Sequence, residues 1–151
     1  MIDNSENVNE SEFQNKTQSD EVIDILNDLR VKNYNRIIIA NLNINSISSK
    51  FDELKAIING NIDIFVLTET KLDVSFPIGQ FCIEGFSKPY RLDRNRNGGG
   101  VLIYVRDDIP SRLLNLHNFP YDIEGMFIEI NLRKTKWLIY GTYHPPSQND
   151  K

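Results

Sequence analysis

Unbroken apolar runs, more than alternating ones, mark the strands of this chain. Residues 36–43, 62–67 and 100–105 are rich in β-branched and aromatic side chains, which is typical of strands covered on both faces. Between the first two runs, apolar residues recur at helical spacing from residue 48 or 49 to residue 59, and Gly60 then favours the end of a helix. The pattern predicts a strand–helix–strand unit and leaves the direction of strand pairing open.

Two further runs, residues 125–131 and 136–143, predict a hairpin that turns across residues 133–135. Neither run alternates well, which indicates strands with both faces covered. The intervening residues 73–100 are rich in glycine, proline and polar side chains, so we expect loops there with one short strand at 81–83. The overall fold class is therefore α/β.

The N-terminal part differs in composition from the rest. Residues 1–18 are polar and acidic with little to bury, so we expect a disordered leader. Residues 19–33 predict a short helix, from 20 to 30 with Ser19 as its cap, and a linker that together form an appendage to the core. The globular part is predicted to comprise residues 36–151.

The charge of the 151-residue chain is unevenly distributed. Its net charge is −4, but residues 1–30 hold eight acids and two bases, so the remainder carries +2. A balance of +2 neither demands nor excludes nucleic acid. No apolar run approaches the roughly 18 residues that span a bilayer, so we expect no membrane association. Cys82 is the only cysteine; it fits a reducing, intracellular compartment and is expected to be a small buried filler.

Three polar residues fall at the ends of three separate strand runs. Asn43 ends the first, Glu69 follows the second, and Tyr143 ends the last, before His144 and two prolines that force the chain out of the sheet. Glu69 alone could be a solvated residue, and Tyr143 alone a half-buried strand aromatic. If the three strand ends share one edge, these side chains would form a site.

The segment before the run at 100–105 is rich in glycine and cations. Three consecutive glycines, residues 98–100, lack the Gly-Lys-Ser/Thr and the following helix of a phosphate loop, and instead favour a flexible or tightly turning entry into the next strand. Arg91, Arg94 and Arg96 stand on an expected exposed loop, where they either contact a nucleic-acid backbone or are simply solvated. His117 has no metal ligand at suitable spacing, and Trp137 is expected to pack in the core or an interface.

Four segments, taken together and in this order along the chain, carry a resemblance to a known family: residues 42–46, 67–72, 98–105 and 140–147. Together they resemble the endonuclease/exonuclease/phosphatase superfamily, and more narrowly the apurinic-endonuclease-like domain of non-LTR retrotransposon (reverse transcriptase) polyproteins. The resemblance covers residues 36–149. It implies a four-layer α/β sandwich with mixed sheets, of which this chain would be the truncated N-terminal half.

The resemblance also implies a chemistry. The family is a Mg²⁺-dependent phosphodiesterase acting on DNA. Glu69 would be the metal ligand, Asn43 would orient the catalytic carboxylate and the scissile phosphate, and Tyr143 would stabilise charge at the phosphate. We expect an intracellular protein, with the nucleus as one candidate location; the oligomeric state stays open.

The chain departs from the family after residue 147. It lacks the Gly-Asp-Phe-Asn and Ser-Asp-His motifs that supply the base and the Asp–His pair. We therefore expect a partial endonuclease domain that is inactive alone, with its second sheet missing and one face of the first sheet uncovered. The alternatives are a non-catalytic nucleic-acid-binding or interaction remnant, and a phosphatase of the same superfamily.

Overall fold

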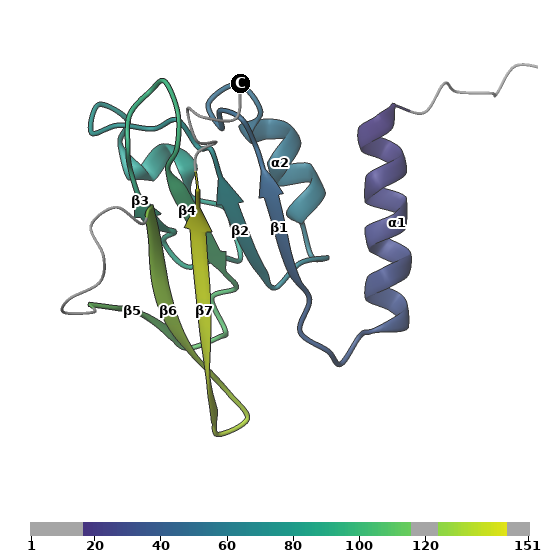
Figure 1. The fold of residues 1–151 in the computed structure, drawn as a ribbon. Coiled ribbons are helices and arrows are strands. Elements are labelled where there is room, and N and C mark those ends of the chain that lie inside the picture. The colour runs from purple at the N-terminus through teal and green to yellow at the C-terminus, as the bar shows by residue number, and fades with distance from the viewer. Residues whose placement is uncertain (1–16, 116–123, 145–151) are drawn as a thin grey trace, which may run out of the picture.

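The computed structural model describes residues 17–115 and 124–144. They form a four-stranded and a three-stranded sheet with helices on one side (Figure 1). The elements in chain order are α1 (Gln18–Lys32), β1 (Ile39–Asn43), α2 (Phe51–Ile58), β2 (Ile64–Thr68), the 3-10 helix η1 (Ile78–Phe81), β3 (Tyr90–Leu92), β4 (Val101–Val105), β5 (Ser111–Leu114), β6 (Glu124–Leu132) and β7 (Thr135–Tyr143).

The first sheet is mixed and has the strand order β1-β2-β4-β3. β1 and β2 are parallel, with Asn43 opposite Thr68, whereas β4 is antiparallel to both β2 and β3. The strand–helix–strand prediction is confirmed, with α2 as the crossover, and the pairing direction that the sequence left open is parallel. Since β4 runs against β2, the beginning of β4 lies at the edge where β2 ends.

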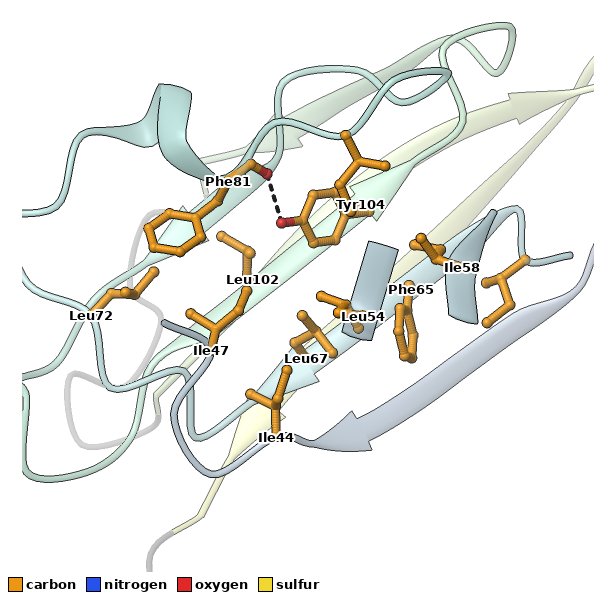
Figure 2. Packing of buried hydrophobic residues seen from close by; sticks show 12 residues of the cluster. Ile44, Ile47, Leu54, Ile58, Phe65, Leu67, Leu72, Phe81, Leu102 and Tyr104 are labelled. Atoms are coloured by element: carbon orange, nitrogen blue, oxygen red, sulfur yellow. Dashed lines mark hydrogen bonds between the residues drawn. The ribbon is translucent and has the colours of Figure 1, made fainter. Parts of the chain in front are cut away.

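Both faces of β2 and β4 are covered, which explains their unbroken apolar sequences. Phe65 and Leu67 face α2 and η1, while Ile64 and Val66 face the second sheet. Figure 2 shows the cluster on the helical side, where the Tyr104 hydroxyl donates to the Phe81 carbonyl at 2.7 Å. Burial raises the pKa of Tyr104, so this phenol keeps the proton that makes the bond.

One buried carboxylate ties the first sheet together. Asp63, only 1% exposed, precedes β2 and accepts hydrogen bonds from the Ile38 backbone N–H and from Arg30 on α1, both at 2.7 Å. It also pairs with Arg106, which follows β4. Because a buried carboxylate is stable only when paired and hydrogen-bonded, this set fixes α1, β1 and β4 relative to β2.

The first helix is longer than its sequence pattern predicts. It begins at Gln18, and its N-cap is Thr17, in a reciprocal capping box with Asp20, so the prediction of Ser19 as the cap is wrong. No residue of α1 is buried, and Leu26 packs partly buried against the core. The helix is nonetheless anchored, because Arg30 reaches Asp63 and Ser19 donates to Glu53 of α2. The predicted disordered leader lies largely outside the described residues.

The predictions for residues 73–100 need three corrections. Residues 81–83 form no strand, because Phe81 ends η1 and the chain only makes an isolated bridge from Phe86 to Arg106. Cys82 is exposed, since its neighbours Phe81 and Ile83 take the inward positions, and it is no buried filler. The expected exposed loop contains the half-buried strand β3, which pairs with β4.

The second sheet consists of β5, β6 and β7, all antiparallel. The predicted hairpin is confirmed, with Leu132 opposite Thr135 and a two-residue turn in which Arg133 and Lys134 both have positive φ. β5 was not foreseen. The expectation that the second sheet is missing is wrong, because these strands cover β2 and β4 on the face opposite α2.

The hairpin prediction was wrong about burial. The residues of β7 are mostly exposed, because this strand lies at the edge of the second sheet with cover on one face only. Trp137 is 54% exposed, so it does not pack in the core. It lines an open groove of about 480 Å³ with Ile39 of β1. Within the described ranges, no helix is both long and apolar enough to cross a membrane.

Candidate functional site

The strands β1, β2 and β7 end at the same edge of the molecule (Figure 1). β2 ends at Thr68 and Glu69 follows it directly, while β7 ends at Tyr143. The condition on which the sequence analysis depended, a shared edge for the three strand ends, is therefore met. The two prolines after His144 lie outside the described residues, as does His117.

Glu69 occupies a backbone conformation that L residues rarely adopt. Its φ is +58°, and Asn45, Ser46 and Lys71 on the same edge also have positive φ. The Glu69 carbonyl accepts from the Ser46 N–H at 2.8 Å, which joins the turns after β1 and β2. Four such residues together concentrate backbone strain at the strand ends, as is common at binding sites.

The side chain of Glu69 contacts two elements. Its Oε2 accepts a hydrogen bond from the Gly99 N–H at 3.3 Å. Glu69 also faces the Tyr143 hydroxyl as a hydrogen-bond acceptor, which is the main reason that the pKa of Tyr143 is raised; desolvation and the charges of Glu69 and Glu124 add to this effect, while the charge of Arg94 opposes it. Tyr143 therefore stays a neutral phenol at physiological pH and can serve as a hydrogen-bond donor.

Glu69 and Tyr143 line one pocket of about 350 Å³. The remaining lining residues all come from the segment before β4: Arg94, Asn95, Asn97 and Gly98. The pocket thus combines a carboxylate, a phenol, a guanidinium and two amides. We call Glu69, Arg94 and Tyr143 together the strand-end site.

The triple glycine shapes this pocket. Gly99 and Gly100 have φ of +74° and +92°, so of the two predicted forms, a flexible entry and a tight turn, the structure has the tight turn, and β4 follows it instead of a helix. A Cβ on Gly100 would collide with the buried Thr70 hydroxyl. The Gly99 carbonyl accepts from the Lys71 N–H at 3.0 Å, which holds the turn against the segment after β2.

The three arginines proposed for nucleic-acid contact have different surroundings. Arg91 is 13% exposed, and its donors are used by Asp93 and by the carbonyls of Asp73 and Phe76. Arg96 is more exposed but binds the Asp73 carboxylate at 2.5 Å. Arg94 alone of the three lines the pocket with Glu69 and Tyr143.

Asn43 lies at the same edge but not in the same pocket. It ends β1, is exposed, and its Oδ1 accepts from the Asn45 N–H at 3.2 Å. It lines a separate hollow beside α2 that includes Lys50 and Leu54. The structure therefore brings Glu69, Tyr143 and Arg94 together and leaves Asn43 beside them, so its catalytic role stays a prediction.

Sequence reasoning missed one acidic residue at this edge. Glu124 begins β6 directly opposite Tyr143, is 13% exposed at its side chain, and accepts a hydrogen bond from the Gly100 N–H. Its Oε2 lies 3.6 Å from Nη1 of Arg94. The only available signal was the hairpin register, because counting back from the turn pairs Glu124 with Tyr143.

The donor set of the strand-end site is compatible with Mg²⁺, which prefers hard oxygen ligands and usually keeps several waters beside one or two carboxylates. Glu69 supplies a carboxylate, and Asn95 and Asn97 supply amide oxygens in the same pocket. Over residues 17–115 and 124–144, no group of three or more His, Cys, Asp or Glu side chains could hold a metal. One carboxylate and two amide oxygens are hard ligands of the kind that Mg²⁺ takes.

No protein-family model and no curated protein sequence matches the chain. Among solved structures, the chain is similar to the 3′ phosphatase NExo from Neisseria, whose structure contains a product DNA hairpin. The two share 22% sequence identity over 68% of this chain, with a TM-score of 0.45. The match spans 40% of the Neisseria chain.

Proposed function

We propose that the strand-end site is the phosphate- and metal-binding part of a Mg²⁺-dependent DNA phosphodiesterase site of the endonuclease/exonuclease/phosphatase type. The observation that carries the proposal is the convergence of Glu69, Arg94 and Tyr143 on one pocket, although they are distant in sequence. These residues provide an oxygen ligand for a cation, a positive charge for a phosphate and a neutral hydrogen-bond donor.

Each side chain has a distinct part in this proposal. Arg94 binds the phosphate, because its guanidinium matches the geometry of phosphate oxygens. Tyr143 stays protonated across the physiological pH range and, by turning its single O–H from Glu69 to the ligand, donates to a phosphate oxygen. Glu69 would hold Mg²⁺, with Asn95 or Asn97 beside it, and the bound ion would supply Lewis-acid stabilisation of charge on the phosphoryl group.

The same pocket lacks a residue to activate water. None of its six described lining residues is a histidine or an aspartate, and Glu69, the only carboxylate among them, accepts from the Gly99 N–H and is assigned here to the cation. A hydrolytic site needs a base for the attacking water as well as charge stabilisation. We therefore propose that residues 1–151 by themselves bind DNA in the presence of Mg²⁺ without cleaving it.

The narrower assignment to retrotransposon-type endonucleases rests on sequence segments. Residues 98–105 place the glycine turn and β4 next to the pocket, and β7 carries Tyr143 to it. Both segments belong to those that resemble the retrotransposon domains. The proposed substrate is accordingly DNA, bound through its backbone phosphates.

The test measures DNA affinity with and without the cation. A fluorescein-labelled DNA duplex is titrated with the protein in about 5 mM Mg²⁺ and in EDTA, and binding is measured by fluorescence anisotropy. Plasmid nicking is followed in parallel. We expect Mg²⁺ to strengthen binding by about tenfold, which corresponds to about 1.4 kcal/mol, without nicking. Glu69→Gln should abolish the Mg²⁺ effect.

Glu84→Gln, which removes an exposed carboxylate outside the pocket, is the matched control and should behave as the wild type. Equal Mg²⁺ responses in the Glu69 and Glu84 variants would contradict the metal assignment. Nicking by the wild type that is lost in Glu69→Gln would contradict the proposed lack of turnover.

A further inference from the structure

Two successive glycine amides at the strand-end site each hold a different carboxylate. The Gly99 N–H donates to Glu69, and the Gly100 N–H donates to Glu124. The two acidic side chains come from β6 and from the turn after β2, so the glycine turn joins both sheets at this edge. Glu69 has a part in the proposed function, whereas Glu124 has none so far.

Glu124 faces Arg94 across the glycine turn. The Arg94 Nη1 and Glu124 Oε2 are 3.6 Å apart, which is an ion pair longer than a hydrogen bond. The Glu124 side chain is 13% exposed and fixed by the backbone, whereas that of Arg94 is 45% exposed. The less mobile partner is therefore the carboxylate, and it biases where the guanidinium lies.

Gly99 provides the space in which this pair forms. A Cβ on Gly99 would come within 2.6 Å of the Arg94 Cδ and within 2.6 and 2.7 Å of the two Glu124 carboxylate oxygens. Any larger residue would have to displace one of these side chains. The absence of a side chain at this position is therefore what allows Arg94 and Glu124 to converge.

Arg94 faces Glu124 through its Nη1. Nε and Nη2 can then bind two oxygens of one phosphate, while Nη1 stays toward Glu124. An arginine restrained in this way loses less conformational freedom when the phosphate binds.

We propose that Glu124 is a positioning residue of the strand-end site, which acts by holding the Arg94 guanidinium beside Glu69 and Tyr143 in the orientation that receives a backbone phosphate. This inference rests on the proposed function, since it assigns Arg94 to the phosphate. It adds a residue from the second sheet to a site otherwise built from the ends of β2 and β7 and the turn before β4.

The test compares Glu124→Gln with Arg94→Ala and the double variant, using the labelled DNA duplex in EDTA at several salt concentrations. Simple electrostatics predicts that removing a negative charge strengthens DNA binding. If Glu124 positions Arg94, the opposite result is expected. In Glu124→Gln the glutamine oxygen still accepts from the Gly100 N–H, but its NH₂ group now faces the Arg94 guanidinium. The affinity for DNA should therefore fall about two- to fivefold. Arg94→Ala should weaken binding about tenfold.

Two readouts separate positioning from a purely structural role. If Glu124 acts through Arg94, the double variant should bind as weakly as Arg94→Ala, and no more weakly. In both single variants, the slope of log affinity against log salt should become less steep by the amount that corresponds to about one phosphate contact. A partly unfolded variant would instead keep the salt slope of the wild type, and a smaller fraction of its molecules would bind DNA.

Glu129→Gln is the control, since it removes the same charge from the opposite face of β6. If Glu124→Gln does not unfold cooperatively, Glu124→Asp replaces it; its shorter carboxylate cannot reach both partners, and the same weakening is expected. Unchanged or tighter binding by the Glu124 variant, or losses that add in the double variant, would overturn the inference while the proposed function stands. If Arg94→Ala has no effect, both fail.

Discussion

β2 and β7 consist of similar types of residue, but they differ in how far their side chains are buried. Each is a run of apolar, β-branched and aromatic residues, yet all five residues of β2 are buried, whereas Gly141 alone is buried in β7. β2 lies inside the first sheet between α2 and the second sheet, and β7 is an edge strand covered on one face. An apolar run thus identifies a strand without giving the number of layers that cover it.

The largest expected effect tests this difference in burial directly. Leu67→Ala removes a fully buried side chain and should lower the free energy of unfolding by about 2–5 kcal/mol, through lost burial and a cavity. Leu138→Ala removes the same atoms from a residue that is 61% exposed and should cost less than about 0.5 kcal/mol. Urea unfolding measures both, and similar losses would contradict the description of the Leu138 face of β7 as uncovered.

A buried polar contact of the first sheet should show the next largest effect. Asp63→Asn removes the charge shared by Arg30 and Arg106 and is expected to lower the free energy of unfolding by about 1–3 kcal/mol. Asp108→Asn is a matched control, because Asp108 also binds Arg106 but is 61% exposed; its cost should be below about 1 kcal/mol. If both variants unfold at the same urea concentration, Asp63 is not the anchor that the structure indicates.

The exposed face of β7 should affect association more than stability. Leu138→Lys places a cation opposite Glu129 on β6, so the free energy of unfolding should change by less than about 0.5 kcal/mol. Sedimentation velocity at increasing protein concentration should show less self-association than in the wild type, because exposed apolar faces associate. Val74→Lys, at a loop residue that is 98% exposed, should have little effect on association.

The smallest effect concerns the pH dependence of the second sheet. A hydrogen bond from Arg112, together with the charges of Arg112 and Lys136, lowers the pKa of Glu129 below its usual value of 4.5. Its contribution to stability is therefore present above the unfolded-state pKa and is lost as the pH falls through the folded-state pKa. Unfolding of wild type and Glu129→Gln from pH 7 to pH 2.5 should show a difference that shrinks in that acid range; a constant difference would contradict the assignment.

The long strands of the first sheet could be predicted because strands that are buried on both faces have unbroken apolar sequences. The runs at 62–67 and 100–105 correspond to β2 and β4 within two residues, and the helical pattern after residue 48 corresponds to α2. The short strands β3 and β5 escaped prediction, since four residues or fewer carry no recognisable period. The layering of the second sheet also escaped it, because that depends on contacts between distant segments.

The candidate site was predictable in part for the same reason. Glu69 and Tyr143 were found because they directly follow or end long apolar strands, and the parallel ends of β1 and β2 meet at one edge. Sequence could not separate Arg94 from Arg91 and Arg96, because their environments depend on how the turn before β4 folds. The hairpin register was the only sequence signal for Glu124, and it does not show the contact with the amide of the glycine turn before β4 on which the role of Glu124 depends.

The most direct test of the strand-end site compares two neighbouring arginines. Duplex DNA binding is measured at low salt for the wild type, Arg94→Ala and Arg96→Ala, which remove the same charge from the same loop. We predict that Arg94→Ala weakens binding about tenfold, whereas Arg96→Ala changes affinity by less than about twofold because Asp73 already holds that side chain. Equal losses in the two variants would mean that DNA responds only to loop charge, and would contradict a site at Glu69, Arg94 and Tyr143.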